Sequence, residues 1–222
     1  MKRLAVFDLD GTLIDSRATI DMAVRQAWTE LRLEPPSYDQ TRQIVGLSLL
    51  DAVRILAPDL DPSRYPELSE AYKNAFLTNR AKGHVEPLYD GALDMLAELK
   101  REGWLLGIAT GKARRGIRHF YDRHGAEHFF DAAFCADDGP GKPDPHMLRL
   151  NMQALDVDPA QTIMIGDTTH DMKMARAAGA YALGVSWGFH TRDEVAGDAH
   201  AVVDDFPTLG EHLVNWRASA DN

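Results

Sequence analysis

The sequence predicts an α/β fold, a Rossmann-like parallel sheet with helices on both faces, into which an all-helical cap domain is inserted near the amino terminus. Three observations favour this fold. Short apolar runs alternate with helical patterns from residue 87 onward, as in a parallel sheet with right-handed crossovers. The first apolar run, Leu4–Phe7, ends in a pair of acidic residues. Between these two parts, residues 16–80 show helical patterns and no strand pattern.

These patterns set the boundaries of two domains. We expect a discontinuous core made of residues 1–15 and 87–222, and a helical cap made of residues 16–86. The cap would be joined to the core by two connections, residues 13–16 and 81–86. A domain held by two short connections can hinge over a site on the core.

The first predicted strand, Leu4–Phe7, is followed at once by Asp8 and, one residue later, by Asp10. Gly11 permits a sharp turn, so both carboxylates should lie at the carboxyl end of the strand, where open α/β sheets bind ligands. An acidic pair at such a place needs a cation. An EF-hand calcium loop is excluded, because Gly11 comes too early and the closing Glu position falls at Thr19. The remaining alternative is a surface turn with two solvated carboxylates.

The expected cap contains helical stripes broken by proline-rich turns. Helices are predicted at residues 20–31, 41–45, 49–56 and 65–76. Asp15 and Ser16 are natural caps for the first of these helices. The loop Gly46-Leu47-Ser48 is expected to face the site. Arg42 and Arg54 could contact an anion there, and the alternative is that both are simply exposed.

The core continues as alternating helices and strands, and three of its strands lead into polar segments. Further strands are predicted at residues 105–109, 132–134, 162–165, 182–185 and 201–203. Thr110-Gly111-Lys112 follows the first of them, and a segment containing Gly141-Lys142-Pro143 follows the second. Gly166-Asp167-Thr168-Thr169-His170-Asp171 follows the third. The terminal residues 218–222 are expected to fray.

In this order and spacing, the acidic pair and the three polar segments resemble the four motifs of the haloacid dehalogenase superfamily of phosphohydrolases. The resemblance covers residues 1–203. Pro87-Leu88-Tyr89-Asp90-Gly91, together with the helical insert, is similar to the subfamily that contains phosphoglycolate phosphatase. Dehalogenase members lack the second acidic residue, so the presence of Asp10 favours phosphoryl transfer.

The resemblance implies that Asp8, Asp10, Asp167 and Asp171 share one pocket. Two carboxylates about 4 Å apart repel by roughly 4 kcal/mol at a protein-like dielectric, so the pocket needs a cation. All-oxygen ligands favour Mg²⁺. The resemblance further implies that Asp8 and Asp167 bind the ion by side chain and Asp10 by its backbone carbonyl, with Asp171 in support.

Catalytic roles follow from the same resemblance. Asp8 is expected to be the nucleophile that forms a phosphoaspartyl intermediate, and Asp10 the general acid and base. Thr110 and Gly111 are expected to hold phosphoryl oxygens, and Lys142 to neutralise charge on Asp8 and on the moving phosphoryl group.

The roles of several other polar residues have alternative interpretations. Lys112 either contacts substrate or, as lysines usually do, lies on a solvated face. His124 and His128 stand at helical spacing, but no third zinc ligand follows in pattern, so we interpret them as ordinary surface histidines. The role of His170 is open.

Composition restricts the classes of partner. A formal net charge of −10 argues against nucleic acid or an anionic membrane. Cys135 is the only cysteine, and no run of residues reads as a signal peptide or a membrane span, so a cytoplasmic protein without an intramolecular disulfide is expected. The expected partner is a small phosphorylated metabolite, and the chain is expected to be a monomer or a homodimer.

The favoured function is therefore a Mg²⁺-dependent phosphatase that hydrolyses a small phosphate monoester, as phosphoglycolate phosphatases do. The alternatives are a sugar phosphomutase of the β-phosphoglucomutase type or a pyrophosphatase, because such enzymes share the motifs. A non-catalytic phosphate-binding regulator is the third alternative, although such a protein would ordinarily have lost Asp8, Asp10 or Lys142.

Overall fold

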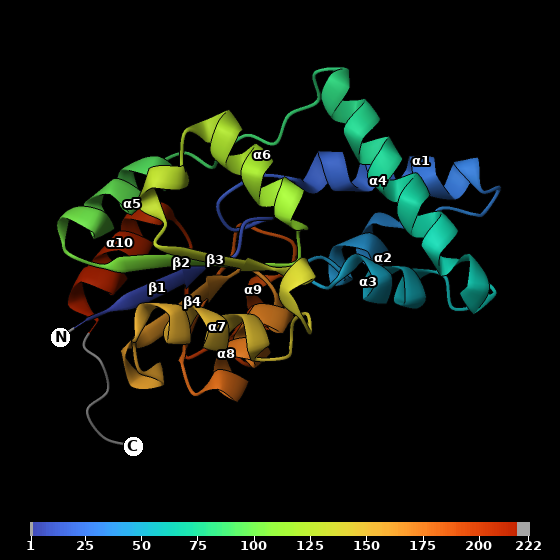
Figure 1. The fold of residues 1–222 in the computed structure, drawn as a ribbon. Helices are drawn as coiled ribbons and strands as arrows, with labels where there is room; N and C mark the ends of the chain where they lie inside the picture. Colours follow the sequence, from blue (N-terminus) through green and yellow to red (C-terminus); the bar gives the residue numbers. More distant parts are fainter. Residues whose placement is uncertain (1, 217–222) are drawn as a thin grey trace.

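The computed structural model describes residues 2–216, so the expectation for residues 218–222 lies outside the described residues. Within this range six parallel strands form one sheet in the order β3-β2-β1-β4-β5-β6 (Figure 1). The strands are β1 (Leu4–Phe7), β2 (Leu105–Thr110), β3 (Ala132–Cys135), β4 (Thr162–Gly166), β5 (Tyr181–Val185) and β6 (Ala201–Val203). The predicted parallel sheet is confirmed, and its order brings the carboxyl ends of β2, β1 and β4 side by side.

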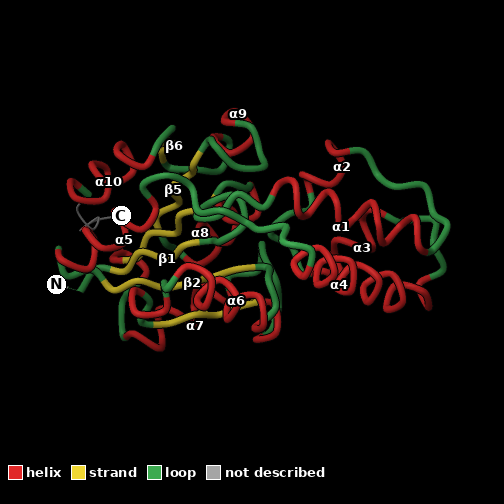
Figure 2. The backbone as a smooth tube through the Cα atoms, turned by 90° about the horizontal axis from the view of Figure 1, so that it is seen from above, coloured by secondary structure: helices red, strands yellow, loops and turns green. Residues whose placement is uncertain are grey.

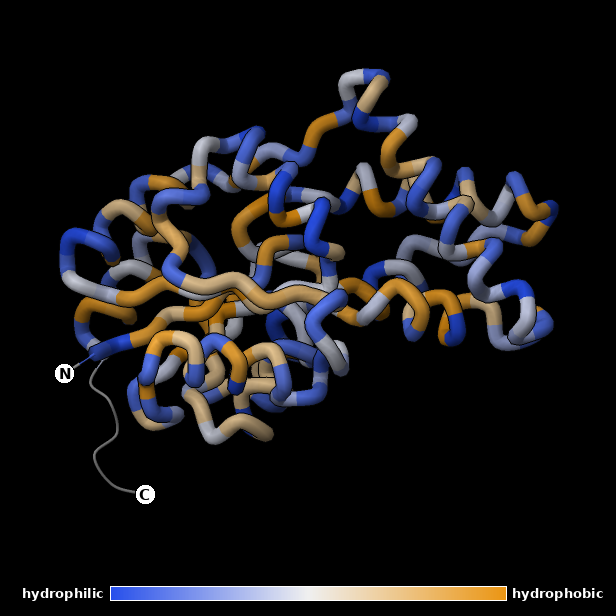
Figure 3. The backbone as a smooth tube through the Cα atoms, viewed as in Figure 1, coloured by the Kyte–Doolittle hydropathy of each residue, from blue (hydrophilic) through white to orange (hydrophobic). Residues whose placement is uncertain are grey.

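Helices cover both faces of the sheet (Figure 1). One face carries α5 (Ala92–Arg101), α6 (Arg114–His124) and α10 (Phe206–Asn215), and the other carries α7 (His146–Leu155), α8 (Thr169–Ala178) and α9 (Arg192–Ala196). In β1, Ala5 and Phe7 pack on the first face and Leu4 and Val6 on the second, which explains the unbroken apolar run. Figure 3 shows these strands as a hydrophobic band enclosed by helices with hydrophilic outer turns.

The helical insert lies beyond the carboxyl ends of the strands (Figure 2). It consists of α1 (Arg17–Glu30), α2 (Tyr38–Gln43), α3 (Leu49–Leu56) and α4 (Tyr65–Ala81). A short 3₁₀ turn, Pro62–Arg64, precedes α4, and three more lie in the core at Glu127–Phe129, Ala136–Asp138 and Pro159–Gln161. The insert has a small core of its own, to which Val24, Trp28, Val53 and Leu68 contribute. No helix within residues 2–216 has both the length and the apolar character needed to cross a bilayer.

Two details of the insert differ from the sequence prediction. Helix α2 begins at Tyr38 rather than at residue 41, because Ser37 and Gln40 form a capping box. Ser16 occupies the N-cap position of α1, but its hydroxyl accepts no capping hydrogen bond. The predicted side-chain cap at Ser16 is therefore wrong. Asp15 accepts a hydrogen bond from the amide of Arg17, the first residue of α1, at 3.2 Å and also forms an ion pair with Arg17 at 2.6 Å.

The two connections between insert and core are paired with each other. Ile14 forms an antiparallel bridge with Leu88, and the Asp15 amide donates a hydrogen bond to the Pro87 carbonyl at 2.8 Å. Figure 2 shows these segments as adjacent loops between the two parts. The joint is therefore a short two-stranded piece of backbone, a few residues beyond the predicted second connection at residues 81–86.

Candidate active site

The carboxyl ends of β1 and β4 carry three aspartates whose side chains meet. The Asp8 amide donates a hydrogen bond to the Ile165 carbonyl at 3.0 Å, which fixes the end of β1 against β4. Asp167 follows β4 directly, and Asp171 lies on the first turn of α8. Carboxylate oxygens of Asp8, Asp167 and Asp171 lie within 4.8 Å of one another, and all three residues are fully buried.

Lys142 reaches into this aspartate cluster from the loop that follows β3. Its Nζ lies 2.9 Å from Asp8 Oδ1 and 2.6 Å from Asp171 Oδ1, and its side chain is fully buried. Burial alone would lower the pKa of Lys142, but the charges of Asp171 and Asp8 outweigh it and raise the pKa above its ordinary value. Lys142 is therefore a charged partner of the predicted nucleophile.

Asp167 is held by hydrogen bonds to both of its oxygens. The Thr12 hydroxyl donates to Oδ1 at 2.9 Å, and the Phe189 amide donates to Oδ2 at 2.7 Å. A Cβ atom at Gly11 or at Gly188 would lie 2.2 Å from Asp167 Oδ2, so the backbone packs too closely there for any side chain. These contacts fix the Asp167 carboxylate beside Asp8.

The two carboxylate oxygens of Asp171 have different partners. Oδ2 accepts hydrogen bonds from the Thr168 amide at 3.1 Å and from the Thr168 hydroxyl at 2.6 Å, which completes a capping box at the start of α8. Oδ1 faces Lys142. Asp171 therefore positions the lysine as well as adding negative charge to the cluster.

The cluster contains more negative charge than its lysine can neutralise. Burial, together with the charges of Asp171 and Asp10, outweighs the attraction of Lys142 and raises the pKa of Asp8 to about 6. Burial and the charges of Asp171 and Asp8 raise the pKa of Asp167 well above its ordinary value. Asp8 Oδ2 is buried, and no group within residues 2–216 forms a hydrogen bond with it. Three buried carboxylates with an unpartnered oxygen form an all-oxygen donor set, and this set fits a hard divalent cation.

The side chain of Asp10 lies outside the cluster and pairs with Lys112. Lys112 Nζ lies 2.8 Å from Asp10 Oδ1 and 3.5 Å from Glu86 Oε1. Arg80 completes the network through Glu86 Oε2 at 2.9 Å. The Lys112 side chain is only 9% exposed, so its predicted place on a solvated face is wrong, because Asp10 and Glu86 meet beneath it. Burial lowers the pKa of Lys112, but Asp10 and Glu86 together raise it above its usual value.

The predicted phosphate-binding residues lie beside the cap loop. Thr110 is buried at the end of β2, and its hydroxyl accepts a hydrogen bond from the Lys112 amide at 3.3 Å. A Cβ atom at Gly111 would lie 2.6 Å from the Gly46 carbonyl oxygen and 2.7 Å from that of Leu47. The loop Gly46-Leu47-Ser48 therefore faces the site as predicted, and only glycine allows its close approach at residue 111.

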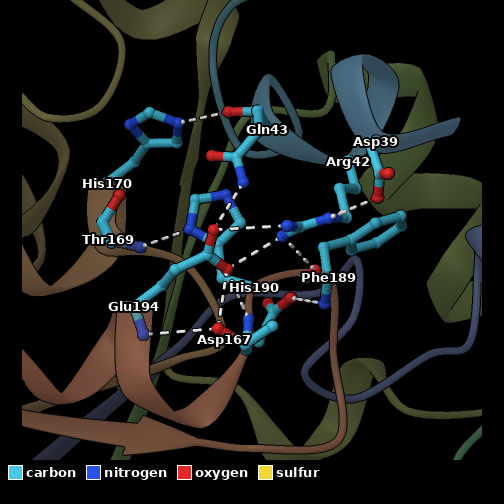
Figure 4. Close-up of polar contacts among 10 residues, drawn as sticks. Asp39, Arg42, Gln43, Asp167, Thr169, His170, Phe189, His190 and Glu194 are labelled. Atoms are coloured by element: carbon cyan, nitrogen blue, oxygen red, sulfur yellow. Dashed lines mark hydrogen bonds and ion pairs between the residues drawn. The ribbon is translucent and has the colours of Figure 1, made fainter. Parts of the chain in front are cut away.

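A second contact joins the insert to the core through the end of α2 (Figure 4). Arg42 Nη1 lies 2.8 Å from Glu194 Oε2 and donates a hydrogen bond to the Phe189 carbonyl at 3.3 Å. A ring nitrogen of His170 lies 2.9 Å from the Gln43 carbonyl oxygen. Arg42 is therefore not simply exposed, and its guanidinium binds Glu194 of the core instead of a ligand anion. His170, whose role was open, contacts the insert through the Gln43 carbonyl. Phe189 also holds Asp167, so this contact adjoins the aspartate cluster.

We expect Arg42→Met to lower the free energy of unfolding by about 1–2 kcal/mol, because Arg42 is 19% exposed and bonds both a carboxylate and a carbonyl. Arg54→Met is the matched control, because Arg54 is 56% exposed and forms an ion pair with Asp51 at 3.2 Å, on its own helix. Its expected cost is below about 0.5 kcal/mol. Urea unfolding measures both, and equal costs would show that the contact through α2 contributes nothing to stability.

Sequence patterns did not indicate several residues that support the site. Thr12 and Phe189 hold Asp167, whereas Glu86 and Arg80 surround Lys112. Of these four residues, Thr12 alone lies close to the acidic pair in the sequence, so its position could have indicated a role in the site. The two histidines of the zinc alternative lie apart from the cluster: His124 packs against Phe120 with ring centroids 5.5 Å apart, and His128 is exposed.

The chain is similar in sequence and in fold to known hydrolases. The family model of the haloacid dehalogenase-like hydrolases matches residues 5–185. The chain is 37% identical to the probable phosphatase IndB of Dickeya dadantii, over 93% of this chain and 91% of the relative. It is 32% identical to a phosphoglycolate phosphatase of Pseudomonas putida, over 100% of this chain and 86% of the relative. A predicted phosphatase from Clostridium acetobutylicum has the same fold, with a TM-score of 0.87 at 23% identity, covering 97% of this chain and 100% of that one.

Proposed function

Because the chain belongs to the haloacid dehalogenase-like hydrolases and is a phosphatase of that family, we propose that it hydrolyses a small phosphate monoester through a phosphoaspartyl intermediate on Asp8. The observation that supports this most strongly is the environment of Asp8. One oxygen of its buried carboxylate is 2.9 Å from Lys142, and the other has no hydrogen-bond partner among the described residues. A carboxylate with a free oxygen beside a fixed cation is arranged to attack phosphorus.

We propose that Mg²⁺ binds between Asp8 and Asp167, with the Asp10 carbonyl as a further ligand and Asp171 in support. When bound, it would neutralise the crowded carboxylates and the charge of the phosphoryl oxygens. Thr110 and Gly111 would hold those oxygens by a hydroxyl and an amide N–H. Lys142 would keep Asp8 oriented and balance the negative charge as it shifts between Asp8 and phosphate.

The reaction proceeds in two steps. Asp8 forms a bond to phosphorus as the bond from phosphorus to the ester oxygen breaks, and Asp10 gives its proton to the leaving alkoxide. Water then attacks the phosphoaspartate, Asp10 takes a proton from that water, and the bond to Asp8 breaks to release inorganic phosphate. Asp10 is suited to both proton transfers because its side chain lies outside the aspartate cluster.

We propose that residues 16–86 act as a cap domain on a core of residues 1–15 and 87–222. The paired backbone at Ile14 and Leu88 would act as the hinge of the cap, and the contact of Arg42 with Glu194 would hold the cap against the core. Closure would exclude bulk water and bring the Gly46-Leu47-Ser48 loop over the phosphate.

The function is tested by kcat/KM for a panel of phosphate monoesters, including phosphoglycolate, sugar phosphates and nucleotides, with pyrophosphate added. The expected result is release of one inorganic phosphate for each ester consumed. Formation of an isomeric sugar phosphate without phosphate release would instead identify a mutase, and cleavage of pyrophosphate alone would identify a pyrophosphatase.

Asp10→Asn separates proton transfer from metal binding. The variant keeps the backbone carbonyl but loses the acid, so an alkyl phosphate should lose about 10²–10⁴ in turnover, whereas an aryl phosphate with an acidic phenol should lose less. Mg²⁺ affinity, measured by titration calorimetry, should change little. An equal loss on both esters would show that Asp10 is not the general acid.

A further inference from the structure

A cavity of about 790 Å³ lies between the insert and the core and adjoins the reaction centre. On the core side it is lined by Asp10, Gly111 and Lys112, which places it where the leaving group of a phosphate ester would lie. On the insert side it is lined by side chains of α1, α3 and α4 and of the loop before α3. A cavity of this size holds an organic molecule much larger than a two-carbon acid.

The insert side of the cavity is mostly apolar. Its lining includes Val24, Trp28, Leu49, Val53, Tyr72 and Phe76. Tyr72 and Phe76 lie one turn apart on α4, with ring centroids 5.8 Å apart. The Phe76 ring also lies 5.5 Å from Lys112 Nζ, so this apolar face begins directly beside the ion pair of Lys112 with Asp10.

Within residues 2–216, four of the five cations that line the cavity are paired with carboxylates of the protein. Lys112 pairs with Asp10 and Glu86, and Arg80 pairs with Glu86 and stacks on Phe76 at 4.6 Å. Lys73 pairs with Glu70 at 2.5 Å, and Arg54 pairs with Asp51. Arg115 lines the cavity from an exposed position. A carboxylate in the buried part of the cavity would have to displace one of these partners, which disfavours an acidic leaving group.

We propose that the alcohol released by this phosphatase is bulky and mostly apolar, and that it occupies this cavity during the reaction. The inference rests on the proposed function and narrows its substrate class. It separates this chain from a phosphatase of phosphoglycolate, whose leaving group is small and acidic.

The test is a series of ethyl, butyl, hexyl and octyl phosphates, compared with phosphoglycolate and with acetyl phosphate. The alkyl esters have equally basic leaving groups, so they differ only in the apolar area that can be buried. We expect kcat/KM to rise by about fourfold per methylene until the cavity is filled, as for a CH₂ group that leaves water. Phosphoglycolate should be a poorer substrate than octyl phosphate.

A matched pair of variants locates the effect. Leu50 and Ile55 are both exposed leucine-sized residues of α3, 41% and 57% exposed, but only Leu50 lines the cavity. Leu50→Glu should reduce kcat/KM for octyl phosphate by about tenfold or more and leave ethyl phosphate nearly unchanged, because one carboxylate beside the chain removes apolar contact. Ile55→Glu should leave both esters unchanged.

Binding provides a second readout. Octylphosphonate, which cannot be hydrolysed, should bind at least about 100-fold more tightly than methylphosphonate, with a negative heat-capacity change on titration calorimetry. Three results would overturn the inference if acetyl phosphate is still hydrolysed: equal affinities for the two phosphonates, a kcat/KM that does not change along the alkyl series, or a higher kcat/KM for phosphoglycolate than for octyl phosphate. Loss of acetyl phosphate hydrolysis as well would overturn the proposed function and the inference with it.

Discussion

Asp8→Asn should lower turnover of every phosphate ester by at least about 10⁴-fold, because an amide cannot form the phosphoaspartate. The fold should tolerate the change. Burial raises the pKa of Asp8 to about 6, so the ionised carboxylate is disfavoured in the folded state at neutral pH, and a neutral amide of the same size removes that cost. The melting temperature should stay within about 4 °C of the parent protein.

Asp21→Asn serves as the matched control for this substitution. Asp21 lies on α1 of the insert, forms an ion pair with Arg25 at 2.8 Å, and does not belong to the aspartate cluster. Steady-state hydrolysis of acetyl phosphate should be unaffected in this variant. If Asp8→Asn retained more than about one per cent of activity, Asp8 would not be the nucleophile.

Removal of divalent cations should also abolish turnover, by about 10³-fold or more, and Mg²⁺ should restore it. The reason is the excess charge around Lys142, which alone cannot balance Asp8, Asp167 and Asp171. Ca²⁺ should suppress activity, because it prefers more ligands and longer bonds than this compact set provides. Full activity after exhaustive chelation would contradict the proposed metal site.

Metal binding should be visible in stability as well. At about 100 times its dissociation constant, Mg²⁺ should raise the free energy of unfolding by about 2.7 kcal/mol. Asp167→Asn should lose this stabilisation, because its carboxylate belongs to the cluster, and Asp10→Asn should keep it, because the Asp10 side chain pairs with Lys112 instead. If thermal unfolding showed that Mg²⁺ stabilises Asp167→Asn but not Asp10→Asn, the Asp10 side chain rather than the Asp167 side chain would be the metal ligand.

The strands and the acidic residues that follow them could be predicted because both depend on local sequence. Leu4–Phe7 is apolar throughout, as a strand buried on both faces must be, and Asp8 comes directly after it. Asp167 directly follows β4 and Asp171 lies on the first turn of α8, so both belong to one short strand-to-helix junction. The neighbouring position of β1 and β4, which brings these residues together, came from the family resemblance.

The ion pairs of Lys112 and Arg42 could not be predicted, because their partners are distant in sequence. Lys112 is paired with Asp10 and Glu86 only after the joint between insert and core is formed. Arg42 meets Glu194 across 152 residues, and nothing near either residue indicates the other. Lysine and arginine side chains are usually exposed to solvent, so this preference favoured an exposed position for Lys112 and for Arg42, whereas both are largely buried.

The most direct test of phosphoryl transfer through Asp8 is to trap the intermediate. The enzyme is mixed with labelled acetyl phosphate, quenched in acid within one turnover, digested and sequenced by mass spectrometry. The label should appear on Asp8, be absent in Asp8→Asn, and accumulate in Asp10→Asn, which lacks the base for the second step. Label on a histidine or a serine, or turnover without any labelled enzyme, would contradict the account.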